Sequence, residues 1–171
     1  EAAAIGFSVY GAAFLQAIHG LSALLAGFIL GGIAAGWTVT ALLVSRGGAG
    51  RDALWLRLGI GIITAGIVFG SWAVPRGTPA VAALAMLLLG SGFGLAWAFI
   101  AKAIIGGLRG EERDAGSTAI PTAQLIGGAF GSAGAGAMAA ALGFREGIDA
   151  ERAIRIGPLL FLIFLPFGLA A

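Results

Sequence analysis

The sequence predicts an all-α membrane protein, a bundle of six transmembrane helices. Of the 171 residues, 59% are hydrophobic and only 11% are charged, whereas soluble domains carry roughly a quarter of charged residues. The stretch from Ala115 to Leu142 contains no charge at all. A soluble helix of that length would have to expose one of its faces to water, so this stretch indicates a helix in a lipid bilayer.

Glycine, proline and charged residues divide the apolar sequence into successive spans of one bundle that comprises residues 1–171. We expect these spans at residues 2–18, 23–45, 58–74, 80–105, 115–142 and 157–171. His19–Ser22 is a predicted tight connection, and Pro75–Pro79 is a predicted turn because proline ends one helix and can begin another. Pro158 is expected in the first turn of the last span.

Both ends of the chain indicate a fragment. The sequence begins at Glu1 without a methionine or a basic n-region, so no signal peptide is predicted. The final apolar run, residues 156–171, would reach about 24 Å at about 1.5 Å per residue, less than the ~30 Å of a hydrocarbon core.

Small residues dominate the fifth span, and their spacing predicts close helix packing. Gly127 and Gly131 stand four residues apart, which lets two helix backbones approach each other in a bilayer. Two stripes follow from the helical period. One stripe, expected to face protein or a cavity, holds Gln124, Gly128, Gly131 and Ala135; the other, expected to face lipid, holds Ile126, Phe130, Ala133 and Ala137.

The distribution of arginine and lysine predicts the orientation of the bundle. Basic residues are more frequent around the loops at residues 46–57 and 106–114 than around the other loops. We therefore expect these two loops, and both chain ends, on the cytoplasmic side. Lys102, near the inner end of the fourth span, is expected to extend towards the lipid headgroups.

Four residues are candidates for substrate binding: Gln16, Trp97, Gln124 and His19. A glutamine amide in hydrocarbon needs a partner, so Gln16 and Gln124 should face the bundle or a polar cavity; a hydrogen bond between helices is the alternative. Trp97 shares a stripe with Gly90 and Gly94 and should face other helices, as a pocket wall or by packing. His19, the only histidine, is either an outer gate or an interfacial loop residue.

Several classes of function lack the residues they need. The chain has no cysteine and no Asp or Glu within any predicted span. Paired carboxylates, metal-ligand clusters and nucleophile–base sets are missing, so we expect no enzyme activity, no catalytic residue, no metal and no cofactor. The net charge of +2 reflects arginines in loops, and nucleic acid is not an expected partner.

Three stretches resemble the C-terminal six-helix half of a major facilitator superfamily transporter, most closely its drug:proton antiporter branch. They are AAFLQAIHGLSALLAG (12–27), LLVSRGGAGRDALWLRLG (42–59) and GLRGEERDAGSTAIPTAQLIGGAFGSAGAGAMAAAL (107–142). The second resembles a degenerate copy of the family's basic loop, with Ser45 where an aspartate is usual. The family signature that distinguishes antiporters belongs to the other half of such transporters.

The resemblance implies that the bundle is half of a secondary transporter that works by alternating access around a site at the bilayer midplane. A small hydrophobic or amphipathic substrate and proton-coupled efflux are its implied activity. The implied partners are the missing N-terminal six-helix half, the lipid bilayer and protons, and the implied location is the plasma (inner) membrane. The alternative interpretation is a non-transporting membrane scaffold or channel subunit, which would lack two related three-helix units.

Overall fold

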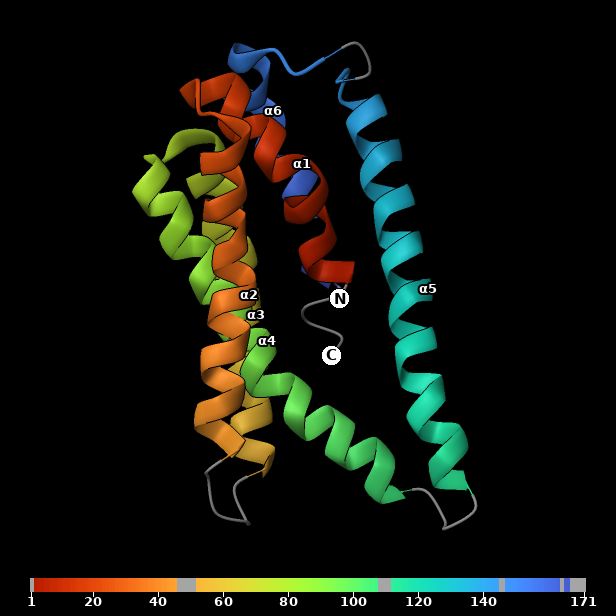
Figure 1. The fold of residues 1–171 in the computed structure, drawn as a ribbon. Coiled ribbons are helices and arrows are strands. Elements are labelled where there is room, and N and C mark those ends of the chain that lie inside the picture. The colour runs from red at the N-terminus through yellow and green to blue at the C-terminus, as the bar shows by residue number, and fades with distance from the viewer. Residues whose placement is uncertain (1, 46–51, 108–111, 145–146, 164, 167–171) are drawn as a thin grey trace.

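A computed structural model describes residues 2–45, 52–107, 112–144, 147–163 and 165–166. Its helices are α1 (Ala2–His19), α2 (Ala23–Ser45), α3 (Asp52–Arg76), α4 (Pro79–Gly107), α5 (Glu112–Ala141) and α6 (Ala150–Leu162). They run alternately up and down (Figure 1). We call the end of the bundle with Ser45, Asp52, Gly107 and Glu112 the lower end, and the opposite end the upper end.

The helix bounds agree with the predicted spans except around prolines and polar loops. α3 begins at Asp52, six residues before the predicted span, and it continues through Pro75 to Arg76, so the predicted turn is confined to residues 77–78. α6 begins at Ala150, because the carboxylate of Asp149 accepts a hydrogen bond from the backbone N–H of Arg152 and caps the helix. Pro158 therefore lies in the middle of α6, and its predicted place in the first turn was wrong.

α4 is the most closely packed helix, because glycines let the backbones of α2 and α3 approach it. A Cβ atom at Gly90 would collide with the carbonyl group of Ile33 on α2. On the α3 side, a Cβ atom at Gly92 would lie 2.6 Å from the backbone nitrogen of Ile63. Contacts of this kind leave no room for any side chain, so α2, α3 and α4 form one tightly packed group (Figure 1).

α5 packs more loosely than its glycines predict. A Cβ atom at Gly127 would meet no other atom within 4 Å, and one at Gly128 would meet only the Ile5 side chain, at 3.9 Å. The expected close approach of backbones at Gly127 is therefore wrong, and at Gly128 the nearest atom belongs to a side chain of α1 and not to its backbone. Figure 1 shows α5 set apart from α2, α3 and α4, with the lower part of α4 leaning towards it.

The structure turns one predicted face of α5 towards the bundle and leaves the other exposed; contact of the exposed face with lipid stays a prediction. The stripe expected to face protein contains two buried residues, Gly131 and Ala135, and two half-buried ones, Gln124 and Gly128. The stripe expected to face lipid is exposed throughout, and the Phe130 side chain is 77% exposed.

Phenylalanines join α6 to α1. The ring of Phe161 stacks on Phe7 with 4.4 Å between ring centroids and meets Phe14 edge-on at 5.3 Å. Phe144, in the segment before α6, packs edge-on against Phe14. All four rings are buried, and offset or edge-on aromatic pairs add to the stabilisation from burial alone.

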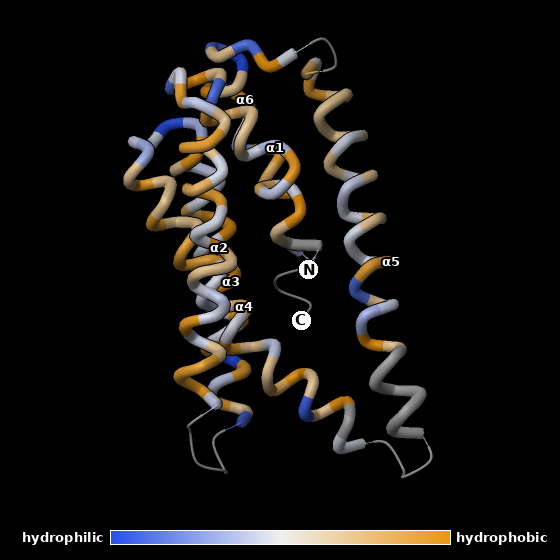
Figure 2. The backbone as a smooth tube through the Cα atoms, viewed as in Figure 1, coloured by the Kyte–Doolittle hydropathy of each residue, from blue (hydrophilic) through white to orange (hydrophobic). Residues whose placement is uncertain are grey.

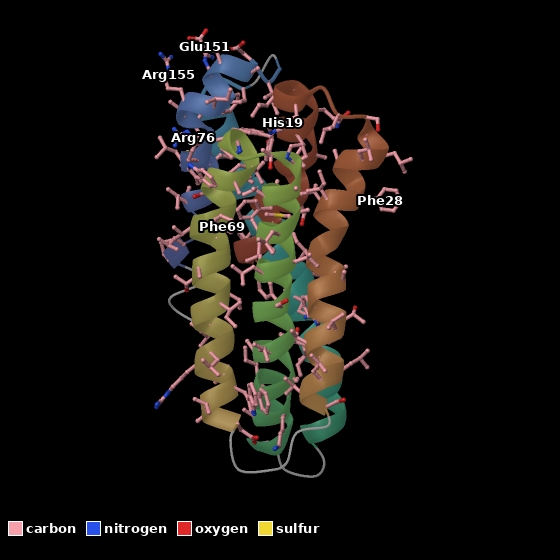
Figure 3. All side chains as sticks on the ribbon, turned by 90° about the vertical axis from the view of Figure 1, so that its left-hand side faces the viewer. His19, Phe28, Phe69, Arg76, Glu151 and Arg155 are labelled. Atoms are coloured by element: carbon pink, nitrogen blue, oxygen red, sulfur yellow. The ribbon has the colours of Figure 1, made fainter. Side chains whose placement is uncertain are left out.

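The distribution of polarity is that of a membrane protein. Within the described residues, α2, α3 and the part Pro79–Ile104 of α4 are long and apolar enough to cross a membrane, and Ala4–His19 is a shorter apolar helix. Figure 2 shows hydrophilic residues gathered at the two ends of the bundle and mostly apolar ones between. Large apolar side chains such as Phe28 of α2, 72% exposed, point outwards from the bundle (Figure 3).

Candidate functional site

Gln16 and His19 lie in the last turns of α1 at the upper end. The Gln16 side-chain nitrogen donates to the Ala12 carbonyl of its own helix at 3.2 Å, so the amide is satisfied locally. Gly20, with a φ of 64°, then ends the helix, as its N–H donates to the Gln16 carbonyl. The tight connection between the first two helices is thus present, and His19 precedes it at the upper end of α1 (Figure 3).

His19 is half-buried, and its Nε2 atom is buried without a hydrogen-bond partner among the described residues. An imidazole nitrogen can accept or donate a hydrogen bond, so Nε2 is able to bind a polar group that reaches it. This leaves both the gate and the interfacial loop residue open as interpretations of His19.

Trp97 lies in the lower half of α4 and contacts α2, as expected from its stripe. Its ring lies 6.4 Å from that of Trp37 on α2, and Trp37 in turn stacks on Phe93 with 5.7 Å between centroids. The two indole rings are half-buried and Phe93 is 8% exposed. The three rings form an aromatic cluster, Trp37–Phe93–Trp97, between α2 and α4.

A hydrogen bond between helices lies next to the aromatic cluster. The Thr40 hydroxyl lies 2.8 Å from the Gly36 carbonyl of its own helix and 3.1 Å from the Ser91 carbonyl of α4. Both carbonyls are therefore within reach of its single proton. Sequence reasoning missed this contact, and the only available signal was a hydroxyl residue on the apolar second span.

Gln124 lies on the face of α5 that is turned towards the bundle. It is half-buried, and it has an interaction partner. One turn above it, Gly128 faces Ile5 of α1, and two turns further up Gly136 faces the Tyr10 hydroxyl, 3.8 Å from the position of a Cβ atom. Gln124 is therefore level with the beginning of the described part of α1.

The four candidates fall into two groups. Ile5 lies beside Gly128, Gln16 follows Ile5 by eleven residues, and Gln124 precedes Gly128 by four. At about 1.5 Å per residue, Gln16 and Gln124 are about 22 Å apart along the bundle. One small molecule cannot contact both, so Trp97 and Gln124 in the lower half are separated from Gln16 and His19 at the upper end.

Among the described side chains, the charged ones lie towards the ends of the helices. The Lys102 ammonium on α4 lies 2.6 Å from the Asp52 carboxylate at the start of α3, so Lys102 pairs with a protein carboxylate where we expected lipid headgroups. Within the described residues no group of three or more metal-binding side chains occurs. Between the helices, the candidate residues and their neighbours offer amide, hydroxyl and indole groups, which can orient a bound molecule by hydrogen bonding and stacking.

Comparison with known proteins points to transport. The chain is 33% identical over 132 residues to a probable multidrug-efflux transporter of Mycobacterium tuberculosis strain CDC 1551 / Oshkosh, and equally to one of strain H37Rv. Each match covers 72% of this chain and 27% of the relative, so the chain spans about a quarter of the length of these curated relatives. No family model and no solved structure matches the chain. Its apolar helices and these relatives together support a membrane protein.

Proposed function

We propose that this chain is one half of a major facilitator transporter that exports small hydrophobic or amphipathic molecules by alternating access. The observation that carries the proposal is the similarity to two probable multidrug-efflux transporters. The described helices bring few polar groups into an apolar interior, which suits substrates of that kind. The N-terminal six-helix half would be the partner across the transport pathway, in the plasma membrane.

The pattern of helix contacts supports the division into two related units. If α1, α2 and α3 are matched with α4, α5 and α6, the contact of α2 with α4 corresponds to that of α5 with α1. Likewise the contact of α3 with α4 corresponds to that of α6 with α1, and α1 with α2 to α4 with α5. Matched helices run in opposite directions (Figure 1), which is the arrangement of inverted repeats in transporters.

We assign substrate contact in this half to Gln124 and Trp97, with Gln16 and His19 further out along the exit path. Gln124 belongs to the looser contact between α1 and α5, where glycine leaves space beside it. The spans contain no carboxylate, so proton coupling in this proposal depends on groups in the other half.

The test is export of a fluorescent lipophilic cation by the full-length protein in reconstituted vesicles, with rates normalised to folded protein. Gln124→Ala and Trp97→Ala should each change the apparent affinity for a substrate by about tenfold, which corresponds to about 1.4 kcal/mol for one lost polar or stacking contact. The loss can differ between substrates and so change the substrate range. Ala137→Leu, on the exposed face of α5, serves as the matched control and should leave export unchanged. Unchanged normalised export in both site variants would exclude the site assignment.

The alternative, a scaffold or channel subunit, makes a different prediction for the same vesicles. A scaffold would show no export with any substrate, and a channel would equilibrate the dye without accumulation. Only the proposed antiporter should accumulate the dye against its own concentration gradient. This accumulation should be lost when a protonophore is added.

A further inference from the structure

Pro158 removes a hydrogen-bond donor from the middle of α6. In an α-helix the carbonyl of Ile154 accepts from the N–H of the residue four positions later, and that residue is Pro158. Within a helix near the membrane surface, a carbonyl left without a partner costs free energy, and the proline ring also presses against it. The Ile154 carbonyl therefore needs a donor from elsewhere.

Arg76, the last residue of α3, supplies such a donor. Its Nε donates to the Ile154 carbonyl at 2.9 Å, and its Nη2 donates to the neighbouring Arg155 carbonyl at 3.1 Å. These two N–H groups lie on one edge of the guanidinium and point the same way, so two successive carbonyls match them. Lysine carries its three N–H donors on one nitrogen, so it cannot offer two parallel donors from separate atoms in this fixed geometry.

The site of this contact is the place where α6 changes in character. Before Pro158, the first turns of α6 carry the exposed charges Glu151, Arg152 and Arg155, and after it the described residues are apolar. Figure 3 shows Arg76, Glu151 and Arg155 together at the upper end of the bundle. Below the proline, the Phe161 ring is held against Phe7 and Phe14 of α1.

We propose that Arg76 replaces, from α3, the donor that Pro158 removes from α6, and that this contact sets the direction in which α6 enters the membrane. α3 belongs to the tightly packed group of α2, α3 and α4, whereas α6 packs on α1 through Phe161, so the contact also joins these two parts of the bundle at the upper end. The inference rests on the geometry at Pro158 and is independent of what the protein transports.

The test is a double-mutant cycle, read as the midpoint of thermal unfolding of the full chain in lipid nanodiscs. Arg76→Gln should lower the midpoint by on the order of 5 °C, as expected for the loss of hydrogen bonds from a charged donor. Pro158→Ala returns an N–H to position 158, so Arg76→Gln in that background should lose less than a third of this amount. Arg155→Gln removes the same charge at the same end and should have little effect in either background.

A distance measurement keeps the proposal testable if Arg76→Gln is too unstable. Spin labels at Val68→Cys on α3 and Leu159→Cys on α6, both exposed positions in a chain without cysteine, report the relative position of the two helices. Arg76→Lys should broaden their distance distribution, and Pro158→Ala should restore a narrow one. Equal losses of stability in both backgrounds, or an unchanged distance distribution in Arg76→Lys, would overturn the proposal.

Discussion

Gly90→Ala is the smallest change that tests how α4 holds the bundle together. A Cβ atom at this position would lie 2.7 Å from the backbone carbon of Ile33 and 2.8 Å from its Cα atom, besides colliding with its carbonyl oxygen. The obstacle is helix backbone and cannot rotate away, so α2 and α4 must separate. Overpacking of this kind costs about 1–3 kcal/mol, which exceeds the gain of roughly 0.5–1 kcal/mol from replacing glycine within a helix. We therefore expect a net loss of stability.

The matched control is Gly27→Ala on α2, where an added Cβ atom would meet nothing within 4 Å. The same helix propensity gain applies there without a collision, so this variant should be as stable as the parent or slightly more stable. Unfolding by a denaturing detergent measures both variants, followed by the fluorescence of the four tryptophans, of which Trp37 and Trp97 lie at this interface. If Gly90→Ala unfolds at the same detergent fraction as Gly27→Ala, backbone contact between α2 and α4 is not what holds them together.

Three further outcomes are expected. A single cysteine at Gly107, at the lower end, should be protected from impermeant thiol reagents in intact cells, and one at Glu151, at the upper end, should be labelled. The reverse pattern would mean that the arginine bias gives the wrong orientation. Gly131→Leu on the buried face of α5 should reduce the yield of folded protein, while Ala137→Leu on its exposed face should not; equal yields would contradict the assigned faces. Asp52→Asn should cost less than about 1 kcal/mol, since the Lys102 and Asp52 side chains are 61% and 42% exposed, and a difference that persists in molar salt would show that the pair is more than a surface contact.

The positions of the helices could be predicted from hydrophobicity, but which helices approach closely could not. α2 carries glycine pairs on two faces: Gly36 lies against the backbone of Leu87, while Gly27 and Gly31 meet nothing within 4 Å. The four-residue spacing of small residues is the same in both cases, and only the position of α4 decides which pair lies against another backbone. The beginning of α6 was predictable, because Asp149 followed by Glu151 is an N-terminal capping pattern, whereas hydrophobicity alone places the start of the last span at residue 157.

The candidate site was predicted residue by residue, and its arrangement was not. An amide that faces lipid without a hydrogen-bond partner costs free energy, so a glutamine within a span is expected to face other helices. The half-buried position of Gln124 could therefore be inferred from the sequence. Its distance from Gln16 depends on the register between α1 and α5, which is set by the contacts of Ile5 and Tyr10 with glycines. Registers of this kind leave no periodic signal in a single sequence.

The difference between α4 and α5 bears on how such a bundle could move. In a bilayer, burial of apolar surface does not by itself favour contact between helices, because lipid chains are equally apolar, so close packing carries most of the attraction. α4 meets α2 and α3 backbone to backbone, and separating the helices by about an ångström forfeits roughly a quarter to a half of the attraction in each such contact. α5 faces α1 at Gly128 and Gly136, where even an added Cβ atom would still lie 3.8–3.9 Å from the ends of the Ile5 and Tyr10 side chains, and that looser contact changes little when one helix slides along the other. If Gly90→Ala proves more damaging than Gly131→Leu, α2, α3 and α4 are the rigid part of the bundle, and a change of access would occur at the contact between α1 and α5, beside Gln124.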